Sequence, residues 1–168
     1  DAALYEPLGE NVRVSVHLLR EQSHGVPLLA PTHRIGNMGY ERHIGMARMD
    51  IDVSESTSLF GWVNAVDNTS DWREADADSD LNTAALGLSH KLTEALTLNT
   101  QFSYSMWTAE TSGEENHWFQ QDLNLVWDIS EAQTLTWGAD YRRNEFLRSA
   151  VEHTPGQDAA GGFLQHEL

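Results

Sequence analysis

The chain has 168 residues, no cysteine and a formal net charge of -16; Lys91 is the single lysine among its ten Lys and Arg residues. Without cysteine there is no disulfide framework and no thiolate metal site. So few cations exclude nucleic-acid binding, which needs clustered positive charge. No apolar run approaches the roughly 20 residues of a membrane-spanning helix, so a helical membrane protein is also excluded.

The first third of the chain predicts two strands separated by a long loop. Asp1 to Glu10 is interpreted as irregular because Pro7 and Gly9 punctuate it. Apolar and polar residues then alternate from Val12 to Leu18, which is typical of a β-strand. Glu21 to Gly39 is rich in His, Pro and Gly and predicts a loop, and alternation resumes from Tyr40 to Val53.

The middle of the chain predicts a strand, an acidic loop and a hairpin. A tight connection at Ser54-Glu55-Ser56-Thr57 leads into a strand from Ser58 to Val66. Asp67 to Asp80 is acidic and has no apolar period, so we expect a solvated loop. The stretch from Leu86 to Ser105 alternates on both sides of Thr93-Glu94-Ala95, which indicates two strands joined by a turn.

The last third predicts three more strands. A polar link follows Trp107, and alternation returns from Phe119 to Trp127. Ser130-Glu131-Ala132-Gln133 is expected to turn the chain into a strand from Leu135 to Tyr141. After a loop around Pro155-Gly156, the chain reaches GGFLQHEL, which indicates an eighth strand.

Two regularities across these strands predict the fold class. Short connections, after Val53, Leu92 and Ile129, alternate with longer polar ones, which is the asymmetry of outer-membrane barrels. One parity of the strands also collects polar groups suited to a lumen: Arg13, His17, Arg48, Asp50, Lys91, Asn99, Gln101, Gln120, Asp122, Asn124, Asp140 and Arg142. We therefore expect an all-β protein, an antiparallel up-and-down transmembrane β-barrel, here a partial barrel of seven or eight strands.

Aromatic residues gather near the long-loop ends of the expected strands: Tyr104, Trp107, Trp118, Phe119 and Tyr141. Such residues form interfacial girdles in membrane barrels, and they also favour sheets in general. We expect them to form a girdle.

Two short segments resemble the barrel strands of TonB-dependent outer-membrane receptors. Gly162-Phe163-Leu164-Gln165-His166-Glu167-Leu168 is similar to the family's G-F-x-Q-D-E-hydrophobic strand, with His166 in place of the acidic residue. Thr136-Trp137-Gly138-Ala139-Asp140-Tyr141-Arg142 is similar to its W-G-x-x-Y-R strand. The pattern of paired strands covers most of Val12 to Leu168.

The resemblance implies a plugged barrel of about 22 strands, of which residues 1–168 are a fragment of one transmembrane domain without its plug. It implies a non-enzymatic receptor and transporter in the bacterial outer membrane that takes up a scarce ligand such as an iron-siderophore complex, a cobalamin or a carbohydrate. The expected partners are outer-membrane lipid, the TonB complex through the missing plug, and a small-molecule ligand. No cofactor is expected.

The residues expected to contact a ligand come from the loops at His24 to Arg34 and Asp71 to Asp80 and from the lumen. They are His24, His33, Arg34, Arg48, Trp72, Arg73 and Arg142. The alternative for Arg48 and Arg142 is ion pairing with Asp50 and Asp140, or with plug carboxylates, to hold the barrel together.

No motif predicts a metal site or a catalytic site. The spacings of His24, His33 and His43 match no compact ligand motif, and exposed loop histidines explain them better. Leu81 and Gly87 stand where an EF-hand that starts at Asp76 would need glycine and glutamate, which leaves at most a looser calcium contact. There is no G-x-S-x-G, no H-E-x-x-H and no glycine-rich phosphate loop.

Two other functions stay open from the sequence. A complete outer-membrane barrel of eight strands fits the length of the chain. A soluble β-sandwich binding module is the second alternative, because alternation does not distinguish a lipid-facing surface from a core.

Overall fold

The computed structural model describes residues 2–24, 27–29, 34–37, 39–72, 75–110, 112–148 and 154–167. Its strands are β1 (Ala2–Pro7), β2 (Val12–Ser23), β3 (Pro27–Leu29), β4 (Arg34–Asn37), β5 (Tyr40–Ser54), β6 (Thr57–Trp72), β7 (Ala75–Thr93), β8 (Leu96–Ala109), β9 (Glu114–Ser130), β10 (Gln133–Arg148) and β11 (Thr154–Glu167). The described residues contain no helix that could span a membrane. The expectation of an all-β, antiparallel up-and-down fold is confirmed.

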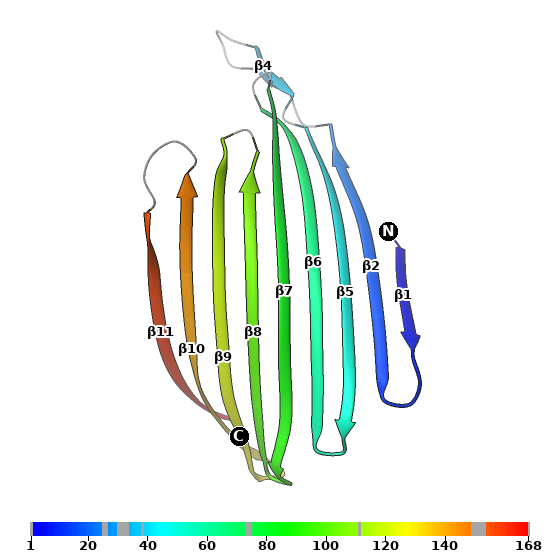
Figure 1. The fold of residues 1–168 in the computed structure, drawn as a ribbon, viewed down its shortest axis with the longest axis vertical. Coiled ribbons are helices and arrows are strands. Elements are labelled where there is room, and N and C mark those ends of the chain that lie inside the picture. Colours follow the sequence, from blue (N-terminus) through cyan, green and yellow to red (C-terminus); the bar gives the residue numbers. More distant parts are fainter. Residues whose placement is uncertain are drawn as a thin grey trace.

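Nine strands form one open sheet in the order β1-β2-β5-β6-β7-β8-β9-β10-β11, so each strand pairs with its neighbours along the chain (Figure 1). All of these pairings are antiparallel. The small strands β3 and β4 pair with each other in a separate two-stranded sheet within the connection from β2 to β5. The sheet is not closed into a barrel.

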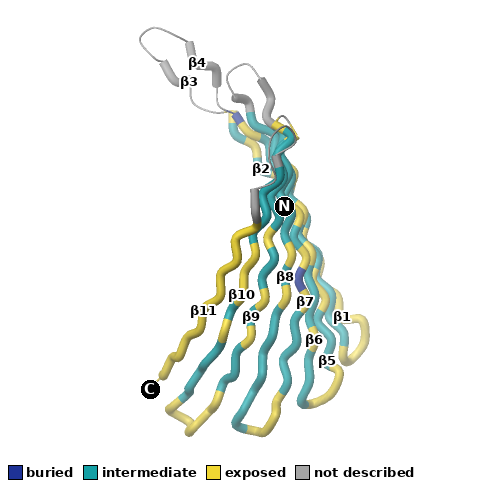
Figure 2. Tube along the Cα trace, turned by 60° about the vertical axis from the view of Figure 1, so that its left-hand side comes forward, coloured by how far each residue is buried: buried dark blue, intermediate teal, exposed yellow. Residues whose placement is uncertain are grey.

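The sheet is a single curved layer, and little of it is buried (Figure 2). Ala85, 3% exposed, is the one buried apolar side chain of the core among the described residues. Leu86, its neighbour in the chain, is 69% exposed on the opposite side. A layer this thin has no hydrophobic interior of its own, so its apolar surface must be covered by something outside the sheet.

Three tight turns at one rim of the sheet share one local structure. Ser54, Thr93 and Ser130 each end a strand, and each side-chain hydroxyl accepts the backbone N–H two residues further on, at distances of 3.3, 3.2 and 3.4 Å. A glutamate lies between donor and acceptor each time, at Glu55, Glu94 and Glu131. Hydroxyl residues stabilise turns in this way. All three turns were predicted from the sequence.

The structure has more strand than the sequence predicted. Ala2–Pro7 is a strand rather than irregular chain, and it makes the count nine instead of seven or eight. Pro7 is tolerated there because β1 lies at the sheet edge, where a missing backbone donor costs little.

The expected loop from Asp67 to Asp80 is also wrong for its described residues. β6 continues to Trp72 and β7 begins at Ala75, with Asp67 opposite Asp80 and Asp71 opposite Asp76. Backbone hydrogen bonds extend this hairpin beyond the apolar pattern, because strand pairing does not require apolar side chains.

Candidate functional site: the polar face of the sheet

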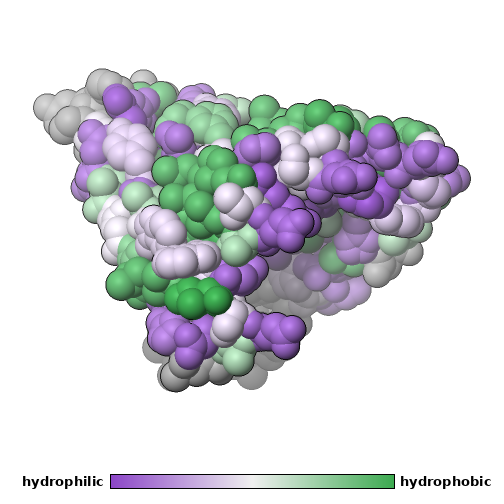
Figure 3. Space-filling model, turned by 90° about the horizontal axis from the view of Figure 1, so that it is seen from below, coloured by the Kyte–Doolittle hydropathy of each residue, from purple (hydrophilic) through white to green (hydrophobic). Residues whose placement is uncertain are grey.

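Side chains of one parity form a polar face. Residues directly opposite each other in antiparallel strands lie on the same face, so the pairings can be followed across the sheet. One row passes through Arg13, Asp50, Phe60, Gly87, Gln101, Asp122 and Asp140. All twelve lumen-type residues predicted from the sequence lie on this face, which we call the polar face. Figure 3 shows the curved molecule from below, with hydrophilic residues along the inside of the bend.

Several charged side chains on the polar face are paired. Arg48 holds Asp50 with three contacts, from Nε at 2.9 and 3.1 Å and from a terminal nitrogen at 2.7 Å. Arg13 contacts Asp52 at 3.1 and 3.2 Å, which links β2 to β5. The geometry between Arg48 and Asp50 is bidentate, which is the stronger kind of ion pair.

A second group of polar contacts lies over β8 and β9. Gln120 Nε2 donates to both carboxylate oxygens of Asp122, at 2.9 and 3.1 Å. Asn99 Nδ2 donates to Asn124 Oδ1 at 3.1 Å. Together with the arginine pairs, these contacts give partners to several half-buried polar groups of the polar face, whereas Asn116 Oδ1 and Asn144 Oδ1 on the same face have none.

Arg142 takes part in a weaker pair. Its Nε lies 3.6 Å from Asp140 Oδ2, and its side chain is 62% exposed. The alternative interpretation of Arg48 and Arg142, pairing with Asp50 and Asp140, therefore describes what the structure contains. The exposed part of the Arg142 guanidinium is available for a ligand or a partner as well.

The two predicted lumen arginines are aligned but not brought together. Arg48 and Arg142 lie in one cross-strand row, which passes through Trp62, Ala85, Ser103 and Gln120. Five strand spacings of about 4.8 Å separate them by roughly 24 Å along the sheet. One small molecule would not touch both without a sharp curve of the sheet.

The remaining expected contact residues are only partly described. His24 is exposed and directly follows the end of β2. Arg34 begins β4 and Trp72 ends β6, but their side chains lie outside the described part of the structure. His33 and Arg73 lie outside the described residues altogether. The predicted loop site therefore stays a prediction.

The opposite face is apolar in its central part. On β5 its residues are Gly45, Ala47, Met49, Ile51 and Val53. On β8 its residues are every second residue from Leu96 to Tyr104. Five alternate positions in an antiparallel strand extend about 27 Å. We call this surface the apolar face. Several of its large side chains are well exposed, including Leu123 at 45% and Trp127 at 44%.

Aromatic rings meet at the loop end of the apolar face. Phe119 packs edge-to-face on Phe102, with ring centroids 4.5 Å apart, and lies 6.3 Å from the ring of Tyr141. The Tyr104 hydroxyl bonds His117 Nδ1 at 2.5 Å. Three of the five predicted girdle residues are in this cluster.

The other two predicted girdle residues lie elsewhere. Trp107 is opposite Asn116 and Trp118 is opposite Ser105, which places both on the polar face. The sequence prediction took position along the strand into account but not parity, and parity decides which surface a side chain reaches.

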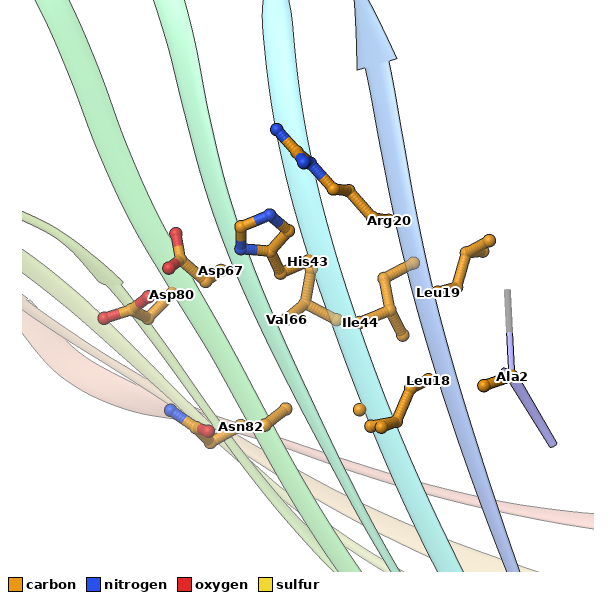
Figure 4. Close-up of a pocket in the computed structure, with 12 residues that line it drawn as sticks. Ala2, Leu18, Leu19, Arg20, His43, Ile44, Val66, Asp67, Asp80 and Asn82 are labelled. Carbon is orange, nitrogen blue, oxygen red and sulfur yellow. The ribbon is translucent and has the colours of Figure 1, made fainter. Parts of the chain in front are cut away.

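A charged row ends the apolar face over β2, β5, β6 and β7. Arg20, His43, Asp67 and Asp80 are successive cross-strand partners above a cleft of about 640 Å³ whose lining includes Leu18, Gly45 and Ala65 (Figure 4). Glu41 accepts contacts from Arg20 at 2.7 Å and His43 at 2.9 Å. The described residues contain no group of three His, Cys, Asp or Glu side chains able to hold a metal ion.

Searches among known proteins give no assignment: no protein-family model matches the chain, and no curated protein sequence matches it. The TonB-receptor resemblance therefore rests on the two segments in which it was found. These segments are direct partners, because Trp137 lies opposite Leu164 and Gly138 opposite Phe163 across β10 and β11.

One close contact on the polar face was not predicted. The Phe60 ring lies across Gly87, and the Arg48 guanidinium lies 4.9 Å from the centre of that ring. The available signal was a glycine inside an otherwise regular strand, which often marks the close approach of a neighbouring group.

Proposed function

We propose that residues 1–168 form part of the wall of a bacterial outer-membrane β-barrel that acts as a receptor and transporter of the TonB-dependent type. The observation that carries this proposal is the contrast between the two faces of one open sheet. The apolar face exposes Leu86 and Leu123 and carries an aromatic cluster at one end, whereas the polar face carries paired charges. Membrane barrels present such a band, about 25 Å tall, to lipid and direct polar groups inward.

The two ends of the sheet differ in a way that indicates which end would face the periplasm. The hydroxyl-glutamate turns between β5 and β6, β7 and β8, and β9 and β10 are short. At the opposite end, β6 and β7 extend into acidic sequence, and the connection from β2 to β5 contains β3 and β4. Short turns are periplasmic and long segments extracellular in outer-membrane barrels. The charged row from Arg20 to Asp80 would then mark the outer boundary of the lipid.

The receptor type rests on the two segments that resemble TonB-dependent receptors. Their side-by-side position in β10 and β11 supports reading them as one hairpin of such a barrel. The ligand class is a scarce nutrient such as an iron-siderophore complex, and the exposed Arg142 guanidinium would suit an anionic group of a ligand or of a plug.

The two alternatives fit less well. Nine strands in an open sheet do not make an eight-stranded barrel. A β-sandwich needs a second sheet against the apolar face. The described residues supply one large layer, and the only other sheet is the small β3–β4 pair.

Two measurements test the proposal separately. The complete protein, produced in its own host, is expected in the outer-membrane fraction of a density gradient; recovery in a soluble fraction would end the membrane assignment. Cells without the gene are then supplied with labelled ferric siderophores, cobalamin and oligosaccharides, with and without a protonophore. Loss of energy-dependent uptake of one class is expected. Unchanged uptake of every class would leave a barrel but remove the receptor function.

A further inference from the structure

Three large aromatic side chains lie together on the polar face, away from the apolar surface. Trp107 on β8 and Phe146 on β10 are both direct partners of Asn116 on β9. Trp118 lies two residues further along β9 and is the direct partner of Asn144 on β10. Trp118 is 37% exposed, and the other two rings are half-buried. We call Trp107, Trp118 and Phe146 the aromatic patch.

The rings of the aromatic patch are not packed on other rings. Diagonal neighbours on adjacent strands lie about 7 to 8 Å apart, which places Trp118 beside both Trp107 and Phe146. In the described part of the chain, however, no ring contact joins any of the three to another aromatic side chain. On the apolar face, by contrast, Phe119 packs on Phe102. Contact with lipid does not explain the aromatic patch, because its side chains are on the other face.

Two side-chain amides lie among these rings. Asn116 is between Trp107 and Phe146 in one cross-strand row, and Asn144 follows Trp118 in the next row. The Oδ1 atoms of Asn116 and Asn144 are covered and accept no hydrogen bond. Such an atom lowers stability until it gains a donor. Because no partner holds either oxygen, each amide can turn its oxygen or its nitrogen toward a ligand.

The two rows that contain the aromatic patch carry no charge over β8, β9 and β10. They are Trp107-Asn116-Phe146 and Ser105-Trp118-Asn144. Arg142, in the next row, is in contact with Asp140. The chain as a whole has a formal net charge of -16. An anionic ligand would therefore be repelled by the chain and would find no cation within these rows, whereas a neutral ligand would not be repelled.

A neutral ring rich in hydroxyl groups fits this combination of side chains. The C–H groups on one face of a sugar ring carry partial positive charge, and they pack on the negative face of an aromatic ring. Sugar hydroxyls donate and accept hydrogen bonds, as the amide of asparagine also does. The rows extend over two strand spacings, about 10 Å, from β8 to β10. This length accommodates more than one sugar ring.

We infer that the aromatic patch, together with Asn116 and Asn144, binds a neutral oligosaccharide. The rings pack on the faces of the sugars, and the two amides form hydrogen bonds with their hydroxyls. This inference rests on the proposed function, which places the polar face in the lumen of a receptor. It assigns to that receptor a carbohydrate ligand in preference to an anionic ferric chelate.

An array of immobilised oligosaccharides tests the ligand class. The complete protein is purified in detergent from the outer-membrane fraction and is applied to neutral glycans and to sulfated and carboxylated ones. The affinity for each glycan that binds is then measured by isothermal titration calorimetry. Ferric siderophores and cobalamin are titrated under the same conditions. We expect binding to neutral glycans.

Substitutions on β9 test the site itself. Trp118→Ala should weaken the affinity for a neutral glycan roughly tenfold, as expected for a central aromatic contact. Trp118→Phe keeps a ring and should retain most of the affinity. Trp127→Ala is the matched control, because Trp127 is on the same strand, is 44% exposed and lies on the apolar face. The affinity of this control should equal that of the unchanged protein.

Asn144→Ala is an independent variant that removes one amide and keeps all three rings. It should also weaken the affinity, and it replaces Trp118→Ala in the comparison if that variant does not reach the outer membrane. An unchanged affinity of Asn144→Ala in that case overturns the inference.

Three other results would overturn the inference. They are binding restricted to charged glycans, ferric siderophores or cobalamin, no binding to any neutral glycan, and equal losses for Trp118→Ala and Trp127→Ala. Each of them would leave the proposed barrel and its location intact. Absence of the complete protein from the outer-membrane fraction would instead tell against the proposed function.

Discussion

The ring of Phe60 on β6 lies across Gly87 on β7, its direct partner on the polar face. The guanidinium of Arg48 lies 4.9 Å from the ring centre and is itself held by Asp50. A glycine, an aromatic ring and an ion pair thus form one stack across β5, β6 and β7. The absence of a side chain at Gly87 is what allows the ring to occupy the space above that residue.

Gly87→Ala is expected to destabilise the protein. The added Cβ would overlap the Phe60 ring, which Arg48 restricts from the other side. We expect the free energy of unfolding to fall by about 1 to 3 kcal/mol, as for other overpacked sites. Urea titration in lipid vesicles measures it.

Gly45→Ala is the matched control for this substitution. Its Cβ would lie 3.6 Å from Leu18 Cδ2, an ordinary contact, so we expect a change within about 0.5 kcal/mol. Equal effects of the two substitutions would show that loss of glycine flexibility, rather than the Phe60 ring, is responsible.

Arg48 and Asp50 should be coupled more strongly than Arg142 and Asp140. The first pair has bidentate contacts from 2.7 Å, whereas the second has one contact at 3.6 Å. Because these side chains are partly exposed, we expect a coupling energy of about 0.5 to 1 kcal/mol for the first pair and less for the second. Two alanine double-mutant cycles on unfolding free energy provide the comparison. A larger coupling for Arg142 with Asp140 would contradict the structure.

Phe119→Ala is expected to loosen the aromatic cluster. It removes the edge-to-face contact with Phe102 and the longer contact with Tyr141, and such contacts contribute about 0.5 to 1.5 kcal/mol each beyond area burial. Leu123→Ala, on the same strand and face, is the control and should cost less. The midpoint of thermal unfolding in detergent reports both. A larger loss for Leu123→Ala would mean that ring contacts add nothing.

Leu86→Arg should be far more harmful than Ser103→Arg. Both positions lie near the middle of neighbouring strands, but Leu86 is on the apolar face and Ser103 is on the polar face. Arginine facing lipid at mid-depth costs about 2 to 4 kcal/mol in a membrane barrel, whereas lumen substitutions are tolerated. The amount of folded protein in the outer membrane is measured for each variant. In a water-soluble protein the 69% exposure of Leu86 would make its substitution harmless.

The alternation of side chains was enough to predict the residues of the polar face, although Trp107 and Trp118 of the expected girdle also lie there. The twelve expected polar-face residues, from Arg13 to Arg142, are all on one side, and the turns at Thr93 and Ser130 were found from short interruptions of the pattern. A side-chain period of two determines which face each strand residue occupies, and a tight turn determines the register of the two strands that it joins. The pairing of neighbouring strands can therefore be predicted.

Strand ends and cross-strand contacts were not predictable in the same way. Asp67 to Asp80 lacks apolar alternation, yet its described residues continue a hairpin because backbone hydrogen bonding does not require apolar side chains. The Phe60–Gly87 contact depends on the register of β6 against β7, which cannot be predicted from the sequence of either strand by itself. The candidate contact residues His33 and Arg73 lie outside the described residues, so they remain predictions from the sequence.

The central claim is that the apolar face contacts lipid while the polar face does not. Because the chain has no native cysteine, single spin labels can be attached at Leu123→Cys and Asn124→Cys, which are adjacent on β9 and point to opposite faces. Paramagnetic collision rates are then measured in vesicles that contain the complete protein. We predict that the label at 123 collides preferentially with oxygen dissolved in the bilayer, whereas the label at 124 collides less with oxygen. Preferential collision of the label at 123 with a water-soluble nickel complex would contradict the claim.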